Sequence, residues 1–274
     1  MGPSSKRGKK IAISGKGGVG KSTIAAALAL HLTQQGKKVI AIDADPDANF
    51  AHALGMPEEM RKSLVTLADE AALIEERTGA KAGVTGQMFS LNPKVDDLIG
   101  KYGVSYNGVH TIVLGAIRRG GGGCACPEST LLRNLVRHLV VNEDETVIID
   151  MEAGIEHIGR GTADSVDMLV VVVEPGSRSI ETAERIYRLA SDIGLEKKIA
   201  VVLNKMRDDG EKQKKRVEAA LPGVPVLGVI PFDERLGEGD EHGAAVIFMN
   251  HAETTLDHLS HLTIRHQHHK SDDF

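Results

Sequence analysis

The residues from Gly15 to Ser22 have types and a spacing that could bind the phosphates of a nucleotide. They fit the phosphate-loop pattern GxxxxGKS/T, with an apolar segment before them and strong helix formers after them. Glycines let backbone N–H groups approach phosphate oxygens, and a helix N-terminus adds partial positive charge. We expect Lys21 to reach the β/γ-phosphates of ATP and Ser22 to be a ligand of Mg²⁺. The predicted phosphate-binding residues are Gly15, Lys16, Gly17, Gly18, Val19, Gly20, Lys21, Ser22 and Thr23. The alternative, a glycine-rich turn that binds nothing, is disfavoured by the Lys-Ser pair and both flanking elements.

Acidic residues follow two apolar segments that read as buried strands. Asp43 ends the segment 39–42, and Asp150 ends the segment 146–149. Ligands of open α/β sheets bind beyond the carboxyl ends of the strands. We therefore expect the Asp150 carboxylate to act on Mg²⁺ or on its water. For the run 43–47, an Asp-Pro turn that only stops the strand is the alternative.

Cys124 and Cys126, the only cysteines of the chain, could bind a metal ion. At positions i and i+2 of an extended segment both thiols point to one side and could hold one soft or borderline ion, Ni²⁺ or Zn²⁺. Two ligands do not close such a site, but a twofold axis between two chains would supply four sulfurs. The alternatives are a reducible disulfide, an inert thiol pair, or completion by histidines near the C-terminus.

Strand-like and helix-like segments alternate along the chain, which predicts an α/β fold. We expect a doubly wound, mainly parallel sheet with helices on both faces, of the phosphate-loop nucleoside triphosphatase kind. A polar extension is expected at 1–9, one ATPase domain at 10–250 with an insertion at about 56–123 lining the active face, and a histidine-rich tail at 251–274. Within the insertion, the apolar spacing from residue 56 to about 79 predicts one amphipathic helix.

Composition excludes several classes of protein. Lysine and arginine total 33 against 38 acidic residues, a formal charge of −5, so electrostatics give no case for a nucleic-acid partner. No apolar run approaches the length that spans a bilayer, so we expect no stable membrane insertion. Two cysteines one residue apart are unlike a secreted disulfide framework, and nothing in the first residues reads as an export signal. A cytoplasmic enzyme fits best.

The lysine at position 16 indicates which family of phosphate-loop proteins the chain resembles. KGGVGKS resembles the deviant phosphate loop of the dimeric ATPases that include the MinD, ParA, arsenite-pump and nickel-insertion proteins. The resemblance implies an ATP-dependent homodimer in which Lys16 crosses the interface to the partner's phosphates. It also implies that Asp45 orients or deprotonates the attacking water and that Asp43 holds the Mg²⁺ shell through water. Contacts to the adenine are implied at Asn204 and Lys205, and a turn that covers the base at Pro231, Phe232 and Asp233.

Five motifs in order resemble one branch of that family. GKGGVGKS, DADPD, LNPKVD, CxCPE and DMxAGIEH are similar to the nickel-insertion branch known as CooC. The resemblance implies an ATPase that delivers Ni²⁺ during maturation of carbon monoxide dehydrogenase, and acetyl-CoA synthase remains open as the client. His157 in the last motif is given no catalytic role.

Two other functions remain open from the sequence. A MinD- or ParA-like positioning ATPase would need a basic amphipathic tail or a basic DNA-binding patch, and residues 246–265 carry Glu253, Asp257 and histidines instead. An iron–sulfur carrier ATPase would use a CxxC pair, whereas this chain has CxC.

Overall fold

The computed structural model describes residues 8–45, 47–82, 84, 86–88, 90–115, 127–138, 144–152, 166–208, 210–236 and 244–265. Eight strands form one sheet in the order β3-β4-β2-β5-β1-β6-β7-β8. All neighbouring strands are parallel except β3, which pairs antiparallel with β4. The expected doubly wound, mainly parallel sheet is therefore confirmed. The strands are β1 (Lys9–Gly15), β2 (Lys38–Ala44), β3 (Val104–Tyr106), β4 (Val109–Val113), β5 (Glu145–Met151), β6 (Met168–Val173), β7 (Ile199–Met206) and β8 (Val226–Pro231).

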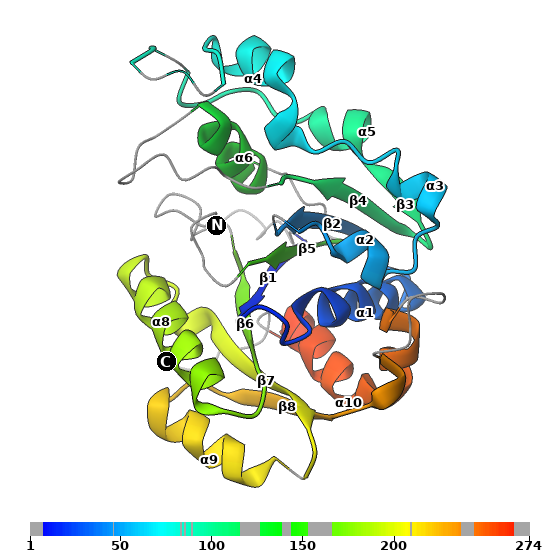
Figure 1. Ribbon diagram of the computed structural model, residues 1–274, viewed down its shortest axis with the longest axis vertical. Helices are drawn as coiled ribbons and strands as arrows, with labels where there is room; N and C mark the ends of the chain where they lie inside the picture. The colour runs from blue at the N-terminus through cyan, green and yellow to red at the C-terminus, as the bar shows by residue number, and fades with distance from the viewer. Residues whose placement is uncertain are drawn as a thin grey trace, which may run out of the picture.

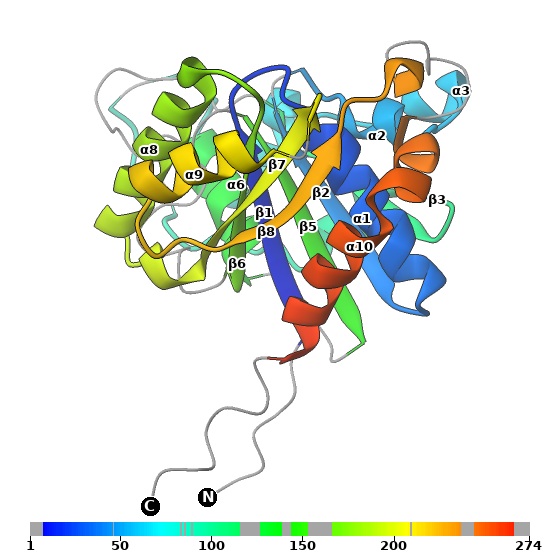
Figure 2. The ribbon, with the colours of Figure 1, turned by 90° about the horizontal axis from the view of Figure 1, so that it is seen from below.

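Helices cover both faces of the sheet, as Figure 2 shows. One buried cluster joins the sheet to α4, α6, α8 and α9, and a second joins its other face to α1, α2 and α10. The helices are α1 (Lys21–Gln34), α2 (Phe50–Ala53), α3 (Glu58–Arg61), α4 (Ala71–Thr78), α5 (Leu98–Tyr102), α6 (Pro127–His138), α8 (Ser177–Asp192), α9 (Glu211–Ala220) and α10 (Ala244–Arg265), with short 3-10 turns at η1 (Leu67–Asp69), η2 (Glu196–Lys198) and η3 (Glu234–Leu236).

The central strands are apolar on both sides because helices bury both faces. In β1, Ala12 belongs to one cluster, whereas Ile11 and Ile13 belong to the other. Side chains alternate between the two faces of a strand, so a continuous apolar run serves both layers. The same strands end together at one edge, and this places the phosphate loop, Asp43 and Asp150 close to one another.

The single helix expected from residue 56 to about 79 is wrong. The structure divides this stretch into α3, η1 and α4. Thr66 forms a parallel bridge with Val113, and the Ala68 N–H donates to the Leu114 carbonyl at 2.9 Å. These bonds draw the chain against the end of β4, so tertiary pairing outweighs the helical spacing.

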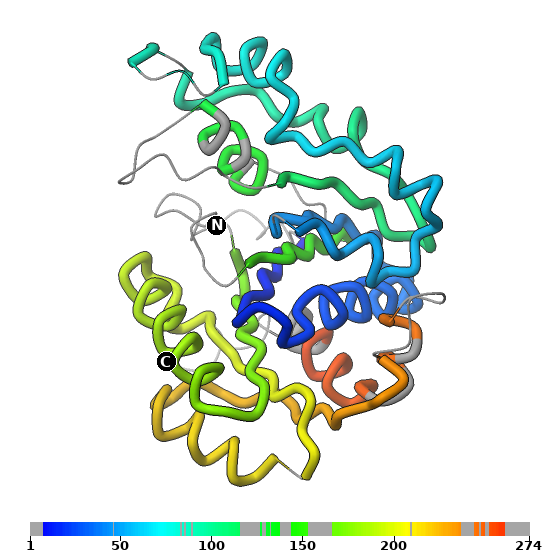
Figure 3. Tube along the Cα trace, in the orientation of Figure 1, coloured from blue at the N-terminus to red at the C-terminus, as the bar shows by residue number. Residues whose placement is uncertain are grey.

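Two segments take part in the fold in a way that the sequence did not indicate. Residues 104–113 of the expected insertion form β3 and β4, and β4 pairs with β2 as part of the sheet. Residues 251–265 of the expected tail are the last turns of α10, which lies beside α1 although the two helices are at opposite ends of the chain (Figures 1 and 3). The remaining extension and tail, 1–7 and 266–274, lie outside the described residues and stay predictions.

Candidate functional site

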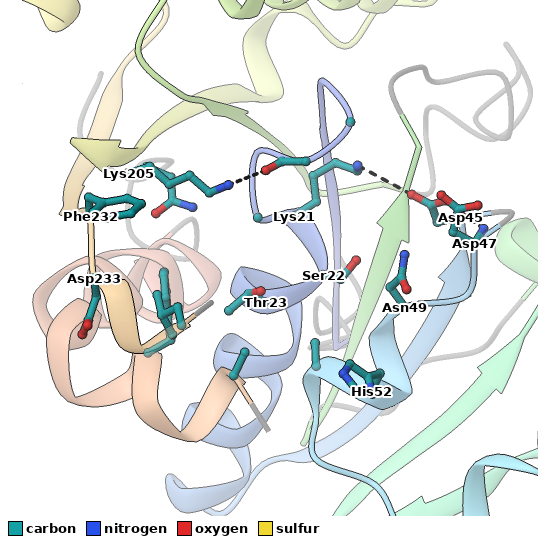
Figure 4. A pocket seen from close by; sticks show the side chains of 18 of the residues that line it. Lys21, Ser22, Thr23, Asp45, Asp47, Asn49, His52, Lys205, Phe232 and Asp233 are labelled. Atoms are coloured by element: carbon teal, nitrogen blue, oxygen red, sulfur yellow. Dashed lines mark hydrogen bonds and ion pairs between the residues drawn. The ribbon is translucent and has the colours of Figure 1, made fainter. Parts of the chain in front are cut away.

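A cavity of about 460 Å³ lies at the carboxyl edge of the sheet (Figure 4). Many of the residues expected to bind nucleotide line it together: Gly17, Gly18, Gly20, Lys21, Ser22, Thr23, Asp45, Asn204, Lys205, Pro231, Phe232 and Asp233. Gly15, Lys16, Val19, Asp43 and Asp150 do not line it. The volume is of the size that small-molecule ligands occupy in proteins. The structure thus brings predicted residues from four separate segments of the sequence to one concave site.

The phosphate loop owes its shape to close backbone contacts. Gly20 has φ 94°, in the left-handed region, and a Cβ at this position would lie 2.5 Å from the Asn204 amide nitrogen. A Cβ on Gly15 would lie 2.5 Å from the Val172 carbonyl oxygen. Any larger residue would therefore push the loop away from β6 or β7. Helix α1 begins directly after Gly20, so its unpaired N–H groups point toward the cavity.

The Lys21 and Asp45 side chains point toward one another in the cavity (Figure 4). The Lys21 Nζ lies 3.6 Å from Asp45 Oδ2, and both side chains are largely buried. The other Asp45 oxygen, Oδ1, accepts a hydrogen bond from the Asp47 N–H at 3.1 Å. A triphosphate that binds here would draw the Lys21 ammonium to its own oxygens and release this side of the Asp45 carboxylate.

Asp43 and Asp150 are paired positions on the neighbouring strands β2 and β5. The Asp43 carboxylate accepts the N–H groups of Asp45 at 3.2 Å and Phe50 at 3.0 Å, which folds the segment after β2 around it. Burial raises the pKa of Asp43 to about 6, against the lowering effect of these two bonds. Burial, and next the Asp43 charge, raise the pKa of Asp150 to about 7, whereas the Ser22 hydroxyl and Lys21 lower it.

These acidic side chains fit a magnesium ion. Asp150 is fully buried, and neither of its carboxylate oxygens has a well-formed hydrogen bond within the described residues. Buried oxygens without partners are costly, and Mg²⁺ prefers oxygen ligands. Ser22, Asp43 and Asp150 would hold the ion directly or through water, and the bound ion would supply positive charge to the phosphates.

The end of β7 is bent so that two side chains reach the phosphate loop. Leu203 pairs with Val229 and Met206 with Pro231, so two residues, Asn204 and Lys205, stand opposite one residue of β8 in a bulge. Lys205 has φ 59°, and its Nζ donates to the Gly18 carbonyl at 2.5 Å. The Asn204 Nδ2 donates to the Val19 carbonyl at 2.8 Å.

The bond to the Val19 carbonyl occupies one of the two N–H groups of the Asn204 amide. A primary amide has two N–H donors and one oxygen acceptor, so one N–H group and the oxygen remain for a ligand. The 6-amino group of adenine is a donor, whereas guanine has an acceptor at the same position. The Asn204 amide therefore keeps the capacity both to donate and to accept, and its contact with the base stays a prediction.

Comparison with known proteins decides the family. Residues 10–246 match the CobQ/CobB/MinD/ParA nucleotide-binding domain. The chain belongs to this family. It is 48% identical over 227 residues to an uncharacterized ATP-binding protein of Methanocaldococcus jannaschii, and the match covers 83% of this chain and 86% of that protein. It is 46% identical over 234 residues to the carbon monoxide dehydrogenase accessory protein CooC of Rhodospirillum rubrum, covering 85% and 88% of the two chains.

Solved structures of MinD and ParA-type proteins have the same fold. The MinC:MinD cell division complex of Aquifex aeolicus matches with a TM-score of 0.64 at 20% identity, covering 94% of this chain and 96% of that chain. A putative plasmid partition protein of Borrelia burgdorferi bound to AMPPNP matches with a TM-score of 0.63 at 18% identity, covering 93% and 99%. This chain is therefore a phosphate-loop ATPase of the MinD/ParA family, and the family implies ATP and Mg²⁺ as its ligands.

The structure adds residues to this MinD/ParA-family site that the sequence reasoning missed. Asn49 and His52 form a wall that faces Phe232 and Asp233 across the cavity (Figure 4), and His52 also contacts Arg61. Their position just after the DADPD motif was the available signal. Other missed residues close the cavity from η3 and α10 and carried no motif: Glu234, Leu236, Ala244 and Phe248.

Some predicted residues of this ATPase are not brought into the cavity. Lys16 turns away from it, and its Nζ lies 2.9 Å from Glu174 Oε1. Cys124, Cys126 and His157 lie outside the described residues, so the metal role of the two cysteines stays a prediction. Within the described part of the chain, no group of three or more His, Cys, Asp or Glu side chains is arranged to hold a metal. No helix there has the length and apolar character to cross a membrane.

Proposed function

We propose that this MinD/ParA-family ATPase delivers nickel to carbon monoxide dehydrogenase during maturation of that enzyme, and that it works as a homodimer. The observation that carries the proposal is the 46% identity to the carbon monoxide dehydrogenase accessory protein CooC, extending over 85% of this chain. The order of the motifs from GKGGVGKS to DMxAGIEH supports the same branch. Acetyl-CoA synthase is the alternative client.

ATP hydrolysis would proceed by in-line attack of water on the γ-phosphate. Lys21 and Lys16 of the partner subunit would neutralise the charge that develops on the phosphate oxygens. Lys21 Nζ lies 3.6 Å from the Asp45 carboxylate, so the carboxylate and the phosphates would compete for this lysine. Asp45 would orient the water once Lys21 has moved to the phosphates. Catalysis would then require two chains, because each site lacks one of its cations without the other.

The cargo metal would be held between the two chains by Cys124 and Cys126. Four thiolates suit Ni²⁺ in a square plane or Zn²⁺ in a tetrahedron, and one chain has only two cysteines. Opening of the dimer after hydrolysis would divide the ligand set and release the ion to the client.

The position of helix α10 argues against a membrane-positioning function. MinD-like positioning would use a free amphipathic segment near the C-terminus. Here the apolar side of α10 is buried against the sheet and α1 through Ala245, Phe248, Ala252, Leu256 and Leu259. These buried side chains of α10 are therefore not available to a lipid surface.

Metal analysis of the purified protein with and without ATP tests the cargo site. We expect one Ni²⁺ or Zn²⁺ per two chains in the ATP-bound dimer and no bound metal in a Cys124→Ala/Cys126→Ala variant that still binds ATP. A variant with His266, His268 and His269 changed to Ala is the control and should retain the metal. One ion per single chain, or retention by the cysteine variant, would place the site elsewhere.

Transfer to the client tests the function itself. Nickel-deficient carbon monoxide dehydrogenase is incubated with the nickel-loaded protein and ATP, and CO oxidation is measured. Activation should require both ATP and Lys16. Nickel-deficient acetyl-CoA synthase is assayed in parallel. Activation of that enzyme alone would identify it, and not carbon monoxide dehydrogenase, as the client. Activation of neither would refute nickel delivery.

A further inference from the structure

The guanidinium of Arg207 lies over the ring of Phe232, 4.2 Å from its centroid. Phe232 lines the cavity and is 38% exposed, so one part of the ring is open to a ligand. Arg207 is exposed and is not among the residues that line the cavity. The cation on the ring thus belongs to a residue outside the cavity lining, whereas Phe232 itself is part of that lining.

The two side chains are brought together by the ends of β7 and β8. Met206 and Pro231 are paired positions, and the Phe232 N–H donates to the Met206 carbonyl at 2.7 Å. Arg207 and Phe232 directly follow the two strands, so they lie opposite one another where the sheet ends. The bulge at Asn204 and Lys205 sets this pairing, and the same bulge directs those two side chains to the phosphate loop.

We propose that Arg207 is a positioning residue for the base of the nucleotide, and that it acts by holding the Phe232 ring as a stacking platform. An aromatic ring at the rim of a cavity has rotational freedom unless something packs against it. A planar guanidinium on one face fixes the ring by a cation–π contact and leaves the other face for a base. The proposal rests on the assignment of this cavity as the ATP site.

Arg235, the other arginine at this rim, is already paired. It holds the Asp233 carboxylate through Nε at 3.0 Å and a second guanidinium nitrogen at 2.7 Å. Arg235 therefore orients an acidic side chain, whereas Arg207 orients the aromatic one. Together with the Asn204 oxygen, Phe232 gives the base site one stacking face and one hydrogen-bond acceptor, a combination that suits adenine.

The experiment is calorimetric binding of ATP and of inorganic tripolyphosphate, each with Mg²⁺, to the full chain. Tripolyphosphate has the phosphates without the base, so it reports on the phosphate loop alone. The variants are Arg207→Met, which keeps an unbranched side chain without the charged plane, Phe232→Leu, and the two together. Arg188→Met, on the exposed side of α8, is the matched control.

The expected result separates the base from the phosphates. Arg207→Met should weaken ATP binding about 3- to 10-fold and Phe232→Leu about 10-fold, with tripolyphosphate unchanged in both. Because Arg207 acts through the ring, adding Arg207→Met to Phe232→Leu should cause no further loss. Equal losses for ATP and tripolyphosphate, additive losses in the double variant, or normal ATP binding by Arg207→Met would each overturn the proposal. Failure of the unchanged protein to bind ATP would instead refute the assignment of the cavity.

Discussion

The Nζ of Lys16 lies 2.9 Å from Oε1 of Glu174 in the same chain. Glu174 is itself held in place, because its N–H donates to Ser179 Oγ at 3.0 Å and its carbonyl accepts the Gln213 amide at 3.0 Å. Helices α8 and α9 thus fix the residue that receives the lysine. If Lys16 acts in the partner's site, as we propose, it must first exchange Glu174 for a phosphate.

Weakening this ion pair should favour the ATP-bound dimer. The lysine side chain is 38% exposed and the glutamate 22%, so the pair is stabilised only modestly. Glu174→Gln keeps the shape and removes the charge, and we expect the dissociation constant of the ATP-bound dimer to fall roughly 2- to 5-fold. Analytical ultracentrifugation with a slowly hydrolysed ATP analogue measures it.

A lysine–aspartate pair far from the cavity supplies the control for Glu174→Gln. Lys38 and Asp144 are 3.0 Å apart on exposed side chains near the start of β2, at the opposite end of the sheet from the cavity. Asp144→Asn should leave the dimer unchanged. A weaker dimer in Glu174→Gln, or equal effects of the two substitutions, would show that Glu174 does not compete for Lys16.

Removal of the lysine itself should separate nucleotide binding from catalysis. Lys16→Ala leaves Lys21 and the loop glycines in the cavity, so ADP should bind with an affinity close to that of the unchanged protein. ATP hydrolysis and ATP-induced dimerisation should both be lost, because the cation expected to cross the interface is gone. Steady-state phosphate release and light scattering check the two properties, and normal turnover would exclude a role for Lys16 in the partner's site.

Asp45→Asn should retain ATP and arrest the cycle before hydrolysis. The amide cannot take a proton from water, while the Lys21 and Ser22 contacts to the phosphates remain available. The Asp47 N–H bond to the side-chain oxygen can persist in the amide, so the segment should keep its fold. A dimer that accumulates with unhydrolysed ATP, measured by chromatography of the extracted nucleotide, is the expected result. Normal hydrolysis would mean that another carboxylate orients the water.

Asp150→Asn should stabilise the protein in the absence of nucleotide and magnesium. The pKa of Asp150 is raised from 3.8 to about 7, so the folded state binds this proton more tightly than the unfolded state. Stability is therefore lost as pH rises from about 4 to about 7, by at most about 1.4 kcal/mol per pH unit. The amide lacks this titration, so its advantage in melting temperature should grow over the same range and level off above it.

The measurement is the melting temperature of the variant and of the unchanged protein from pH 5 to pH 8, in buffer that contains a chelator. Burial also raises the pKa of Asp43, to about 6 in the unchanged protein, so part of the pH dependence should remain in the variant. With Mg²⁺ and ATP the unchanged protein should have the higher melting temperature, because it binds Mg²⁺ and ATP more tightly than the Asp150→Asn variant does. A melting temperature of Asp150→Asn below that of the unchanged protein at pH 8 without ligand would contradict the cost assigned to the buried charge.

The sequence was sufficient for those parts of the site that depend on local order along the chain. The phosphate loop lies between a strand and a helix, and Asp43 and Asp150 follow apolar strands, so their types and neighbours define their places. Parallel strands end at a common edge, which brings such residues together in any sheet of this kind. The sheet, its parallel strands and the helices on both faces could be predicted for the same reason.

The contacts that depend on pairing between distant segments could not be predicted. The bonds of Asn204 and Lys205 to the phosphate loop require a bulge, and nothing in the sequence of β7 marks one. In the sequence, Glu174 and Arg207 cannot be told from other charged residues. Only the folded strands bring them beside Lys16 and Phe232. Strand β4 was missed because its apolar stretch is short and glycine-rich segments surround it.

Helix α10 provides the last prediction. Its many histidines made residues from 251 onward read as a polar tail, although one face of the helix is apolar and buried. Leu256 is fully buried in the cluster that joins α10 to α1, whereas Val246 on the same helix is 48% exposed. Leu256→Ala should lower the free energy of unfolding by roughly 2–4 kcal/mol through lost contacts and a cavity. Val246→Ala should change it by less than about 0.5 kcal/mol. Urea unfolding followed by circular dichroism measures both, and equal stability of the two variants would mean that the C-terminal helix does not belong to the folded core.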